Sequence, residues 1–240
     1  MAGIDNRREE AMWDGVRRTA LFVRQFWTRF RDTGSIAPSS RFLAQEITRR
    51  LAQRCVGAPE LKNADDAKPL RVLECGAGTG SFTDRIVRLL RTGDRLDIVE
   101  LNPTFAAELR RRATREPAWR DTPATLAIYQ EPLEQFAEGD AVSGGYDFII
   151  SGLPHVNFPP AVARDVVASY RRLLKPGGTL SYFEYAYIRP IRRLSTFGRD
   201  SARIREVDKT MGELIRSHEA TRATVWANIP PAWVRHLRIA

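Results

Sequence analysis

The sequence has few cysteines, few lysines and no long apolar run, and each shortage excludes a class of protein. Two cysteines in 240 residues, Cys55 and Cys75, are too few for a disulfide scaffold or a cysteine metal cluster. We therefore expect no metal site and a reducing, cytoplasmic setting. No run of about 18 apolar residues occurs, so the sequence predicts no membrane-spanning helix. The charged first residues also predict no secretory signal peptide.

The charge of the chain is strongly positive. Lysine and arginine number 38 against 29 acidic residues, which gives a net charge of +9. Such a charge favours contact with a polyanion, either nucleic acid or an anionic membrane surface. Alternatively, the positive charge reflects the composition of a GC-rich genome, which would explain why nearly all of the basic residues are arginines.

From Lys68 onward, strand-like and helix-like segments alternate. This pattern predicts an α/β fold, with a mainly parallel sheet and helices on both faces. Expected strands lie within 71–78, 95–102, 124–131, 146–154, 179–188, 223–229 and 232–239. Expected helices lie within 41–54, 81–90, 105–114, 133–139, 161–174 and 203–218, with a turn at 175–178.

The stretch "LECGAGTGSF" carries the clearest chemical signal. Gly76, Gly78 and Gly80 follow a strand and open a helix, where glycine lets the backbone turn and approach a ligand. NAD-binding domains use a related triplet. Here, however, Glu74 precedes the glycines and Glu100 ends the next strand, so one carboxylate can face an ammonium and another a ribose. This combination favours S-adenosylmethionine over a dinucleotide; the alternatives are an ordinary strand–helix turn and a solvated strand end.

Residues 68–240 resemble the class I S-adenosylmethionine-dependent methyltransferases. The resemblance implies a Rossmann-like seven-stranded sheet with S-adenosylmethionine as cofactor. It also implies further cofactor contacts from Asn102, Glu131, Ser151 and Gly152.

The end of the fourth strand bears on the methyl acceptor. Enzymes that methylate exocyclic base nitrogens usually show Asn or Asp followed by Pro-Pro-Tyr, whereas this chain has "SGLPHVNFP". Ser151 and His155 stand where an amide and an aromatic ring would be expected. The stretch therefore argues against base methylation.

Four stretches, "TGSIAPSS", "SGLPHVNFP", "FEYAY" and "ANIPPAWV", together resemble the bacterial soluble-type phospholipid N-methyltransferases. The resemblance implies stepwise methylation of phosphatidylethanolamine toward phosphatidylcholine by a peripheral enzyme on the inner face of the cell membrane. It implies a phospholipid substrate and an anionic membrane surface as partners, with no nucleic acid and a monomeric state. Glu184 and Ala186 depart from the family pattern.

The first thirty residues predict an amphipathic helix. Apolar residues recur at spacings of three and four, with arginines on the flanks, a pattern typical of an interfacial helix. The expected membrane contacts are Trp13, Val16, Phe26, Trp27, Phe30, Arg17 and Arg24. The alternative is a helix packed on the core of the domain.

We accordingly expect two regions. Residues 1–45 would hold the membrane helix and a hinge or lid, and residues 46–240 the methyltransferase domain. Within the lid, Ser35, Ser39 and Ser40 are candidates to contact the lipid, and Ser39 or Ser40 would cap the next helix. The alternative for "TGSIAPSS" is a plain linker.

Methyl transfer requires a neutral amine close to the sulfonium methyl. His155, Glu184 and Tyr185 are candidates to accept the proton or hold the headgroup, and aromatic faces of Tyr185 and Tyr187 suit methylated ammonium groups. Arg189 follows the fifth strand and is a candidate for the lipid phosphate. For each of these residues, the alternative is a structural position without a role in methyl transfer, either packed within the strand or in an exposed loop.

Two other functions remain open. An RNA methyltransferase related to the ribosomal RNA adenine dimethylases would share the fold, the charge and the "GSIAPSS"-like stretch. A non-catalytic membrane-binding protein would have lost cofactor residues, whereas Glu74, the three glycines and Glu100 are all present.

Overall fold

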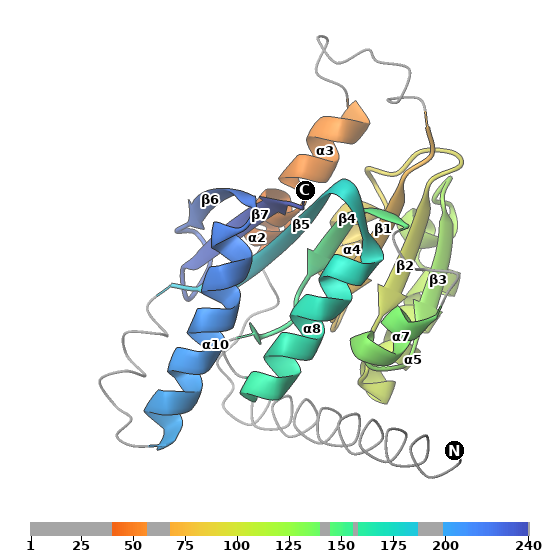
Figure 1. Cartoon of the computed structure of the whole chain (residues 1–240). Helices are drawn as coiled ribbons and strands as arrows, with labels where there is room; N and C mark the ends of the chain where they lie inside the picture. Colours follow the sequence, from red (N-terminus) through yellow and green to blue (C-terminus); the bar gives the residue numbers. More distant parts are fainter. Residues whose placement is uncertain (1–39, 57–67, 140–144, 156–157, 187–198, 240) are drawn as a thin grey trace, which may run out of the picture.

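A seven-stranded sheet forms the centre of the protein in the computed structural model, which describes residues 40–56, 68–139, 145–155, 158–186 and 199–239 (Figure 1). The strands lie in the order β3-β2-β1-β4-β5-β7-β6. Strands β1 to β5 run parallel, while β7 pairs antiparallel with β5 and with β6. The strands are β1 (Arg71–Cys75), β2 (Arg95–Val99), β3 (Thr125–Tyr129), β4 (Tyr146–Ser151), β5 (Leu174–Tyr185), β6 (Glu219–Val225) and β7 (Ala232–Arg238).

The central strands are buried on both faces, and β1 and β2 each include one buried carboxylate, Glu74 and Asp97, among apolar residues. In β1 and in β2, four of the five residues are buried, as expected for parallel strands that are covered by helices on both sides. The outermost strand β3 has no buried residue. The expected sheet of class I methyltransferases, with helices on both faces, is therefore confirmed.

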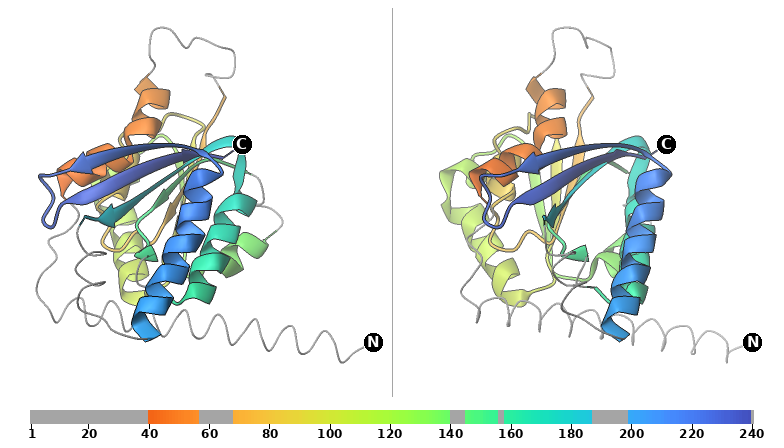
Figure 2. Two further views of the ribbon diagram at one scale, coloured as in Figure 1. Left: turned by 60° about the vertical axis from the view of Figure 1, so that its left-hand side comes forward. Right: turned by 90° about the vertical axis from the view of Figure 1, so that its left-hand side faces the viewer.

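One face of the sheet is covered by α7 (Leu133–Glu138), α8 (Pro160–Leu173) and α10 (Arg199–Arg216). Helices α8 and α10 lie side by side, and Val166 and Met211 belong to the same buried cluster (Figure 2). This cluster continues into the sheet through side chains of β1, β4 and β5. None of the described helices combines the length and apolarity needed to cross a bilayer.

The opposite face carries a second buried cluster. It is covered by α2 (Arg41–Ile47), α3 (Arg49–Val56), α4 (Thr83–Ile86), α5 (Pro103–Arg115) and α6 (Pro117–Arg120). Leu43 and Ile47 of α2 are fully buried in this cluster together with Val234 of β7. Helix α2 is thus packed on the sheet, and residue 45, where the sequence prediction divides the two regions, lies inside this helix.

The helix expected over 41–54 is broken into α2 and α3. Thr48 stands at the break, and its hydroxyl donates to the carbonyl of Ala44 at 2.7 Å. Such back-bonding by threonine competes with the helical pattern of the backbone. Ser40 caps α2 as expected, since its Oγ accepts from the N–H of Leu43 at 3.2 Å.

Other boundaries also differ from the sequence prediction, among them that of β6, which spans Glu219–Val225 although the strand was expected within 223–229. The "KPGG" turn is incorporated into β5, whose pairing with β4 shifts register between Tyr146 and Phe148. Helix α4 is only four residues long. Helix α10 begins at Arg199, four residues before the expected start. The extension of β5 through "KPGG" is supported by hydrogen bonds of Gly177 and Gly178 with Ile239, which no local pattern indicates.

Candidate functional site

The glycine-rich loop connects β1 to α4 at the carboxyl edge of the sheet. Gly76, Gly78 and Gly80 all have positive φ angles, of 69°, 57° and 88°. A Cβ on Gly80 would lie 2.7 Å from the ring of Trp119 and equally close to the guanidinium of Arg112. The loop therefore needs glycine there for backbone conformation and for space.

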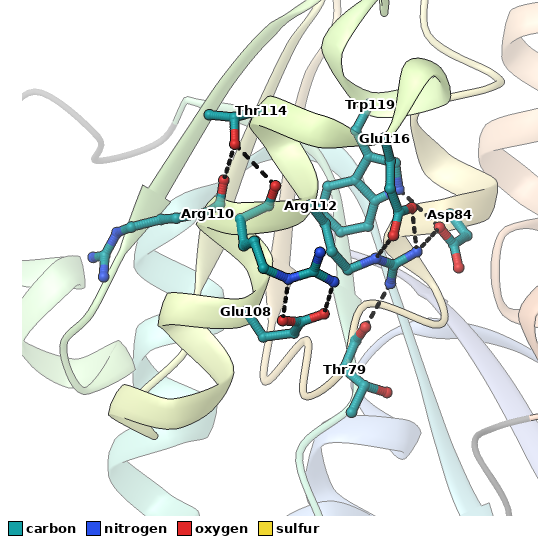
Figure 3. Close-up of polar contacts among 9 residues, drawn as sticks. Thr79, Asp84, Glu108, Arg110, Arg112, Thr114, Glu116 and Trp119 are labelled. Atoms are coloured by element: carbon teal, nitrogen blue, oxygen red, sulfur yellow. Dashed lines mark hydrogen bonds and ion pairs between the residues drawn. The ribbon is translucent and has the colours of Figure 1, made fainter.

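Arg112 of α5 holds this loop in place (Figure 3). Its guanidinium donates to the carbonyl of Thr79 and to Asp84 Oδ1, both at 2.6 Å, and binds both carboxylate oxygens of Glu116. It also lies over the ring of Trp119, 4.4 Å from the centroid. The indole N–H of Trp119 in turn donates to Asp84 at 2.7 Å. One arginine thus joins α5 and α6 to the glycine loop and to α4.

Replacing Arg112 with lysine tests this arrangement. Lysine keeps the charge but loses the planar fork and the stacking on Trp119, so we expect a loss of about 1–2 kcal/mol in stability and weaker cofactor binding. The matched control is Arg111→Lys, one residue away, whose partner Glu108 is exposed and whose effect should stay below about 0.5 kcal/mol. Thermal unfolding and calorimetric titration measure both quantities. Equal effects of the two variants would contradict the positioning role of Arg112.

Glu74 is buried at the end of β1 with an exposed fraction of 0%. Its Oε2 accepts from the hydroxyl of Thr83 at 2.7 Å, whereas Oε1 has no hydrogen-bond partner within the part of the chain that the structure describes. Burial raises the pKa of Glu74 to about 8, against the lowering effect of Thr83. A buried carboxylate oxygen without a partner fits a cationic group bound beside it.

Glu100 follows β2 and points back toward the glycine loop. Its Oε2 accepts from the N–H of Gly78 and its Oε1 from the N–H of Asn102, each at 2.8 Å. Burial raises its pKa, although these hydrogen bonds act in the opposite direction. The Asn102 side chain caps α5, accepting from the N–H groups of Thr104 and Phe105. Asn102 therefore supports Glu100 through its backbone, and its side chain is engaged in the cap.

A cleft opens at the carboxyl ends of β1 to β4; of the residues above, Gly76 and Glu100 line it, whereas Glu74, Gly78, Gly80 and Asn102 do not. Gly76 and Glu100 form one side, and Gly152 and Leu153 after β4 form another. Glu131, half-buried after β3, also lines the cleft, and burial raises its pKa.

Glu134 is a cleft residue that sequence reasoning missed. It lies in the first turn of α7, three residues after Glu131, and burial raises its pKa. Its Oε1 is buried and has no hydrogen-bond partner among the described residues. An acidic residue in the first turn of the helix after the third strand was the available signal, but such residues also occur there to complement the helix dipole.

The side chain of His155 is buried, so it is neither part of an exposed loop nor a base accessible to solvent. Its exposed fraction is 1%, and its Nε2 lies 2.8 Å from the hydroxyl of Tyr170, which is 2.7 Å from Ser151 Oγ. Its ring also packs edge-on against Tyr182, with centroids 5.2 Å apart. Ser151 Oγ accepts from the N–H of Leu153. This buried chain fixes the loop after β4, so the structure gives His155 and Ser151 a positioning role.

The structure places the other two catalytic candidates on opposite faces of β5, because side chains alternate along a strand. Tyr185 is partly exposed and packs edge-on against Phe183, while Phe183 packs against Phe82. Glu184 is buried, with an exposed fraction of 4%, on the same face as Tyr182 and therefore toward His155. The three candidates thus do not form one constellation.

Several expected site residues lie outside the described residues. They are Trp13, Val16, Arg17, Arg24, Phe26, Trp27, Phe30, Ser35, Ser39, Tyr187 and Arg189.

Comparison with known proteins identifies related domains. Residues 72–178 match a family described as methyltransferase domain. An ornithine lipid N-methyltransferase from Singulisphaera acidiphila is 28% identical over 161 residues, 67% of this chain and 74% of that protein. A ribosomal RNA small subunit methyltransferase A, described as probable, from Haloarcula marismortui is 47% identical over 60 residues, 25% of this chain and 20% of that protein. The chain spans only 5% of a related polyketide synthase, NEC1 of Pyricularia oryzae, to which it is 29% identical.

Solved structures share the fold across nearly the whole chain. An O-methyltransferase from Bacillus cereus in complex with SAH superposes with a TM-score of 0.61 at 12% identity, covering 90% of each chain. The O-methyltransferase TomG from Streptomyces achromogenes, in complex with SAM, gives a TM-score of 0.60 at 13% identity, covering 94% of this chain and 90% of that one. At such identities the similarity establishes the fold alone.

Proposed function

We propose that this chain, which carries a methyltransferase domain of the class I fold and uses S-adenosylmethionine, methylates the amine of a membrane lipid. Phosphatidylethanolamine and its partly methylated derivatives are the proposed acceptors. The observation that carries the proposal is the similarity to a lipid N-methyltransferase along 161 residues. The similarities to RNA methyltransferases are shorter, over 60 residues for the ribosomal RNA enzyme and over 93 residues for a tRNA adenine N6-methyltransferase from Pectobacterium carotovorum.

Residues at the carboxyl ends of the strands suit the cofactor. The partnerless oxygen of Glu74 suits the ammonium of the methionine part, and the carboxylate of Glu100 suits the ribose hydroxyls. Glu131, after β3, suits the amino group of adenine. Gly152 lines the cleft at the end of β4, where the methyl group must face its acceptor, and its lack of a Cβ lets this loop approach the backbone of Gly76.

When bound, S-adenosylmethionine supplies a methyl group on a positively charged sulfur, which keeps the bonding electron pair as the amine nitrogen forms the new bond to carbon. The amine must first lose a proton, because its lone pair makes that bond. Burial raises the pKa of Tyr185, so this side chain stays a neutral phenol at physiological pH. We therefore assign Tyr185 an aromatic contact with the headgroup cation and not the role of base.

Binding to the membrane is the remaining part of the proposal. The amphipathic pattern of the first thirty residues and the net charge of +9 support attachment to an anionic inner membrane face. Each basic residue near such a surface contributes about 1 kcal/mol, screened by salt.

The experiment is methyl transfer from labelled S-adenosylmethionine to vesicles of phosphatidylethanolamine, with and without phosphatidylglycerol, and to ribosomal RNA in parallel. We expect label in the lipid, increasing with the fraction of anionic lipid. Label in RNA alone would retain the fold and the cofactor but overturn the lipid acceptor.

A further inference from the structure

Large apolar side chains are exposed at one turn of the sheet. Trp226 and Ile229 lie in the segment that joins β6 to β7, residues 226–231, here named the β6–β7 tip. Their exposed fractions are 67% and 82%. Phe42 and Val56 are the other large apolar side chains exposed within the described ranges. Exposed apolar side chains that gather in one patch mark interaction sites with proteins or membranes.

The β6–β7 tip lies at the catalytic edge of the sheet. Because β7 is antiparallel to β5, its first residue Ala232 pairs with Tyr185, the last residue of β5. The N–H of Ala186 donates to the carbonyl of Pro231 at 2.8 Å. Figure 2 shows the loop between β6 and β7 projecting from the body of the domain beside α2. The tip is therefore next to the strand end that carries the proposed acceptor contact.

Helix α2 is tied to the tip by a hydrogen bond between residues far apart in the chain. The N–H of Ser40 donates to Asn228 Oδ1 at 3.1 Å. Two residues further on, Phe42 has an exposed fraction of 43%, and the guanidinium of Arg41 lies 4.8 Å from the centroid of its ring. An arginine beside exposed aromatic and aliphatic groups matches the composition of surfaces that enter the headgroup region of an anionic bilayer.

The backbone of the tip also suits partial removal from water. Pro230 and Pro231 have no N–H to desolvate. The side-chain amide of Asn228 donates to the carbonyl of Pro230 at 2.7 Å, and the backbone N–H of Asn228 donates to the carbonyl of Val225. Because these polar groups are already paired, transfer of the tip into an interface leaves few of them unsatisfied.

We propose that the β6–β7 tip inserts Trp226 and Ile229 into the lipid headgroup region, as a second membrane contact that brings the catalytic edge onto the bilayer. This inference rests on the proposed lipid acceptor and adds to it a site that is separate from the N-terminal helix. We identify the binding partner as a lipid surface because the apolar tip, Arg41 of α2 and the end of β5 that carries the proposed acceptor contact lie at the same edge of the sheet.

The test compares the double variant Trp226→Ala/Ile229→Ala with Val56→Ala. Val56 is also exposed, at 78%, but it lies at the opposite edge of the sheet. It ends α3, and Arg50 and Arg54 of this helix line a groove with Lys175 at the start of β5. We measure partition into vesicles of phosphatidylethanolamine and phosphatidylglycerol by co-sedimentation, using the full chain. The double variant should bind vesicles about fivefold more weakly, because the transfer of two large apolar side chains is lost. Val56→Ala should bind like the unmodified protein.

Two further readouts separate the possible failures. Cofactor affinity by calorimetry should be the same in the unmodified protein and the double variant, and a parallel loss would mean that the tip is structural. Methyl transfer to dispersed short-chain phosphatidylethanolamine should also persist in the double variant, and its absence from the unmodified protein would overturn the proposed function itself. Unchanged vesicle binding by the double variant, or light scattering that shows a dimer disrupted by it, would overturn the membrane role of the tip.

Discussion

Replacing Gly152 with alanine is expected to abolish methyl transfer and to lower the free energy of unfolding by about 3 kcal/mol. A Cβ at this position would lie 2.5 Å from the carbonyl oxygen of Gly76, which is backbone and has no rotamer to change. The N–H of Gly152 also donates to the carbonyl of Cys75 at 2.8 Å. The loops after β1 and β4 would therefore have to separate, at the point where the cofactor and the acceptor meet.

Gly212→Ala in α10 is the matched control. A Cβ there would meet Arg216 Nη1 at 3.4 Å, the far end of a flexible side chain. Helical propensity predicts a gain in stability of up to about 1 kcal/mol. Urea unfolding and methyl transfer with saturating cofactor measure both variants. A Gly152→Ala protein as stable and as active as Gly212→Ala would refute the close approach of the two loops.

Glu100→Ala is expected to weaken S-adenosylmethionine binding about a hundredfold, since charge-assisted hydrogen bonds contribute about 1.5–3 kcal/mol. Two effects combine in this variant. The ribose contact is lost, and the N–H groups of Gly78 and Asn102 lose the acceptor that orders the glycine loop. Isothermal titration calorimetry gives the affinity directly.

Two comparison variants make the result specific to the carboxylate. Glu108→Ala removes an exposed carboxylate of α5 and should leave cofactor affinity unchanged. Glu100→Gln keeps the shape of the side chain but loses its charge and one acceptor oxygen, so its affinity should lie between those of Glu100→Ala and the unmodified protein. Undiminished binding by Glu100→Ala would remove Glu100 from the cofactor site.

The fold was predictable because its determinants are local. Runs such as Val72 to Cys75 and Leu96 to Val99 are apolar except for Glu74 and Asp97, and such nearly continuous apolar runs are typical of a parallel strand that is buried on both faces. Helix boundaries were less predictable, since the back-bonding of Thr48 interrupts a pattern that remains amphipathic on both sides. The inclusion of "KPGG" in β5 likewise depends on pairing with β4 and β7.

The site was predictable only where one short motif contains it. Glu74 and the glycines lie within seven residues of one another, and Glu100 ends the next strand. The role of Arg112 depends on Thr79 and Asp84, 33 and 28 residues away, so no local pattern indicates it. His155 was expected near the acceptor, but its burial depends on Tyr170 and Tyr182 from two other elements. The separation of Tyr185 from Glu184 follows from strand alternation, and could have been inferred from their adjacent numbers.

The hydrogen bond between Ser40 and Asn228 joins residues 188 positions apart, and β7 lies between β5 and β6 although it follows both in the chain. Domains form as their residues leave the ribosome, at about 5–20 residues per second. Until β7 has emerged, β5 presents an open edge, and α2 lacks the strand that buries Leu43 and Ile47. This edge of the sheet is thus completed only after β7 has been synthesised, and chains that stop before β7 would be exposed to aggregation and proteolysis.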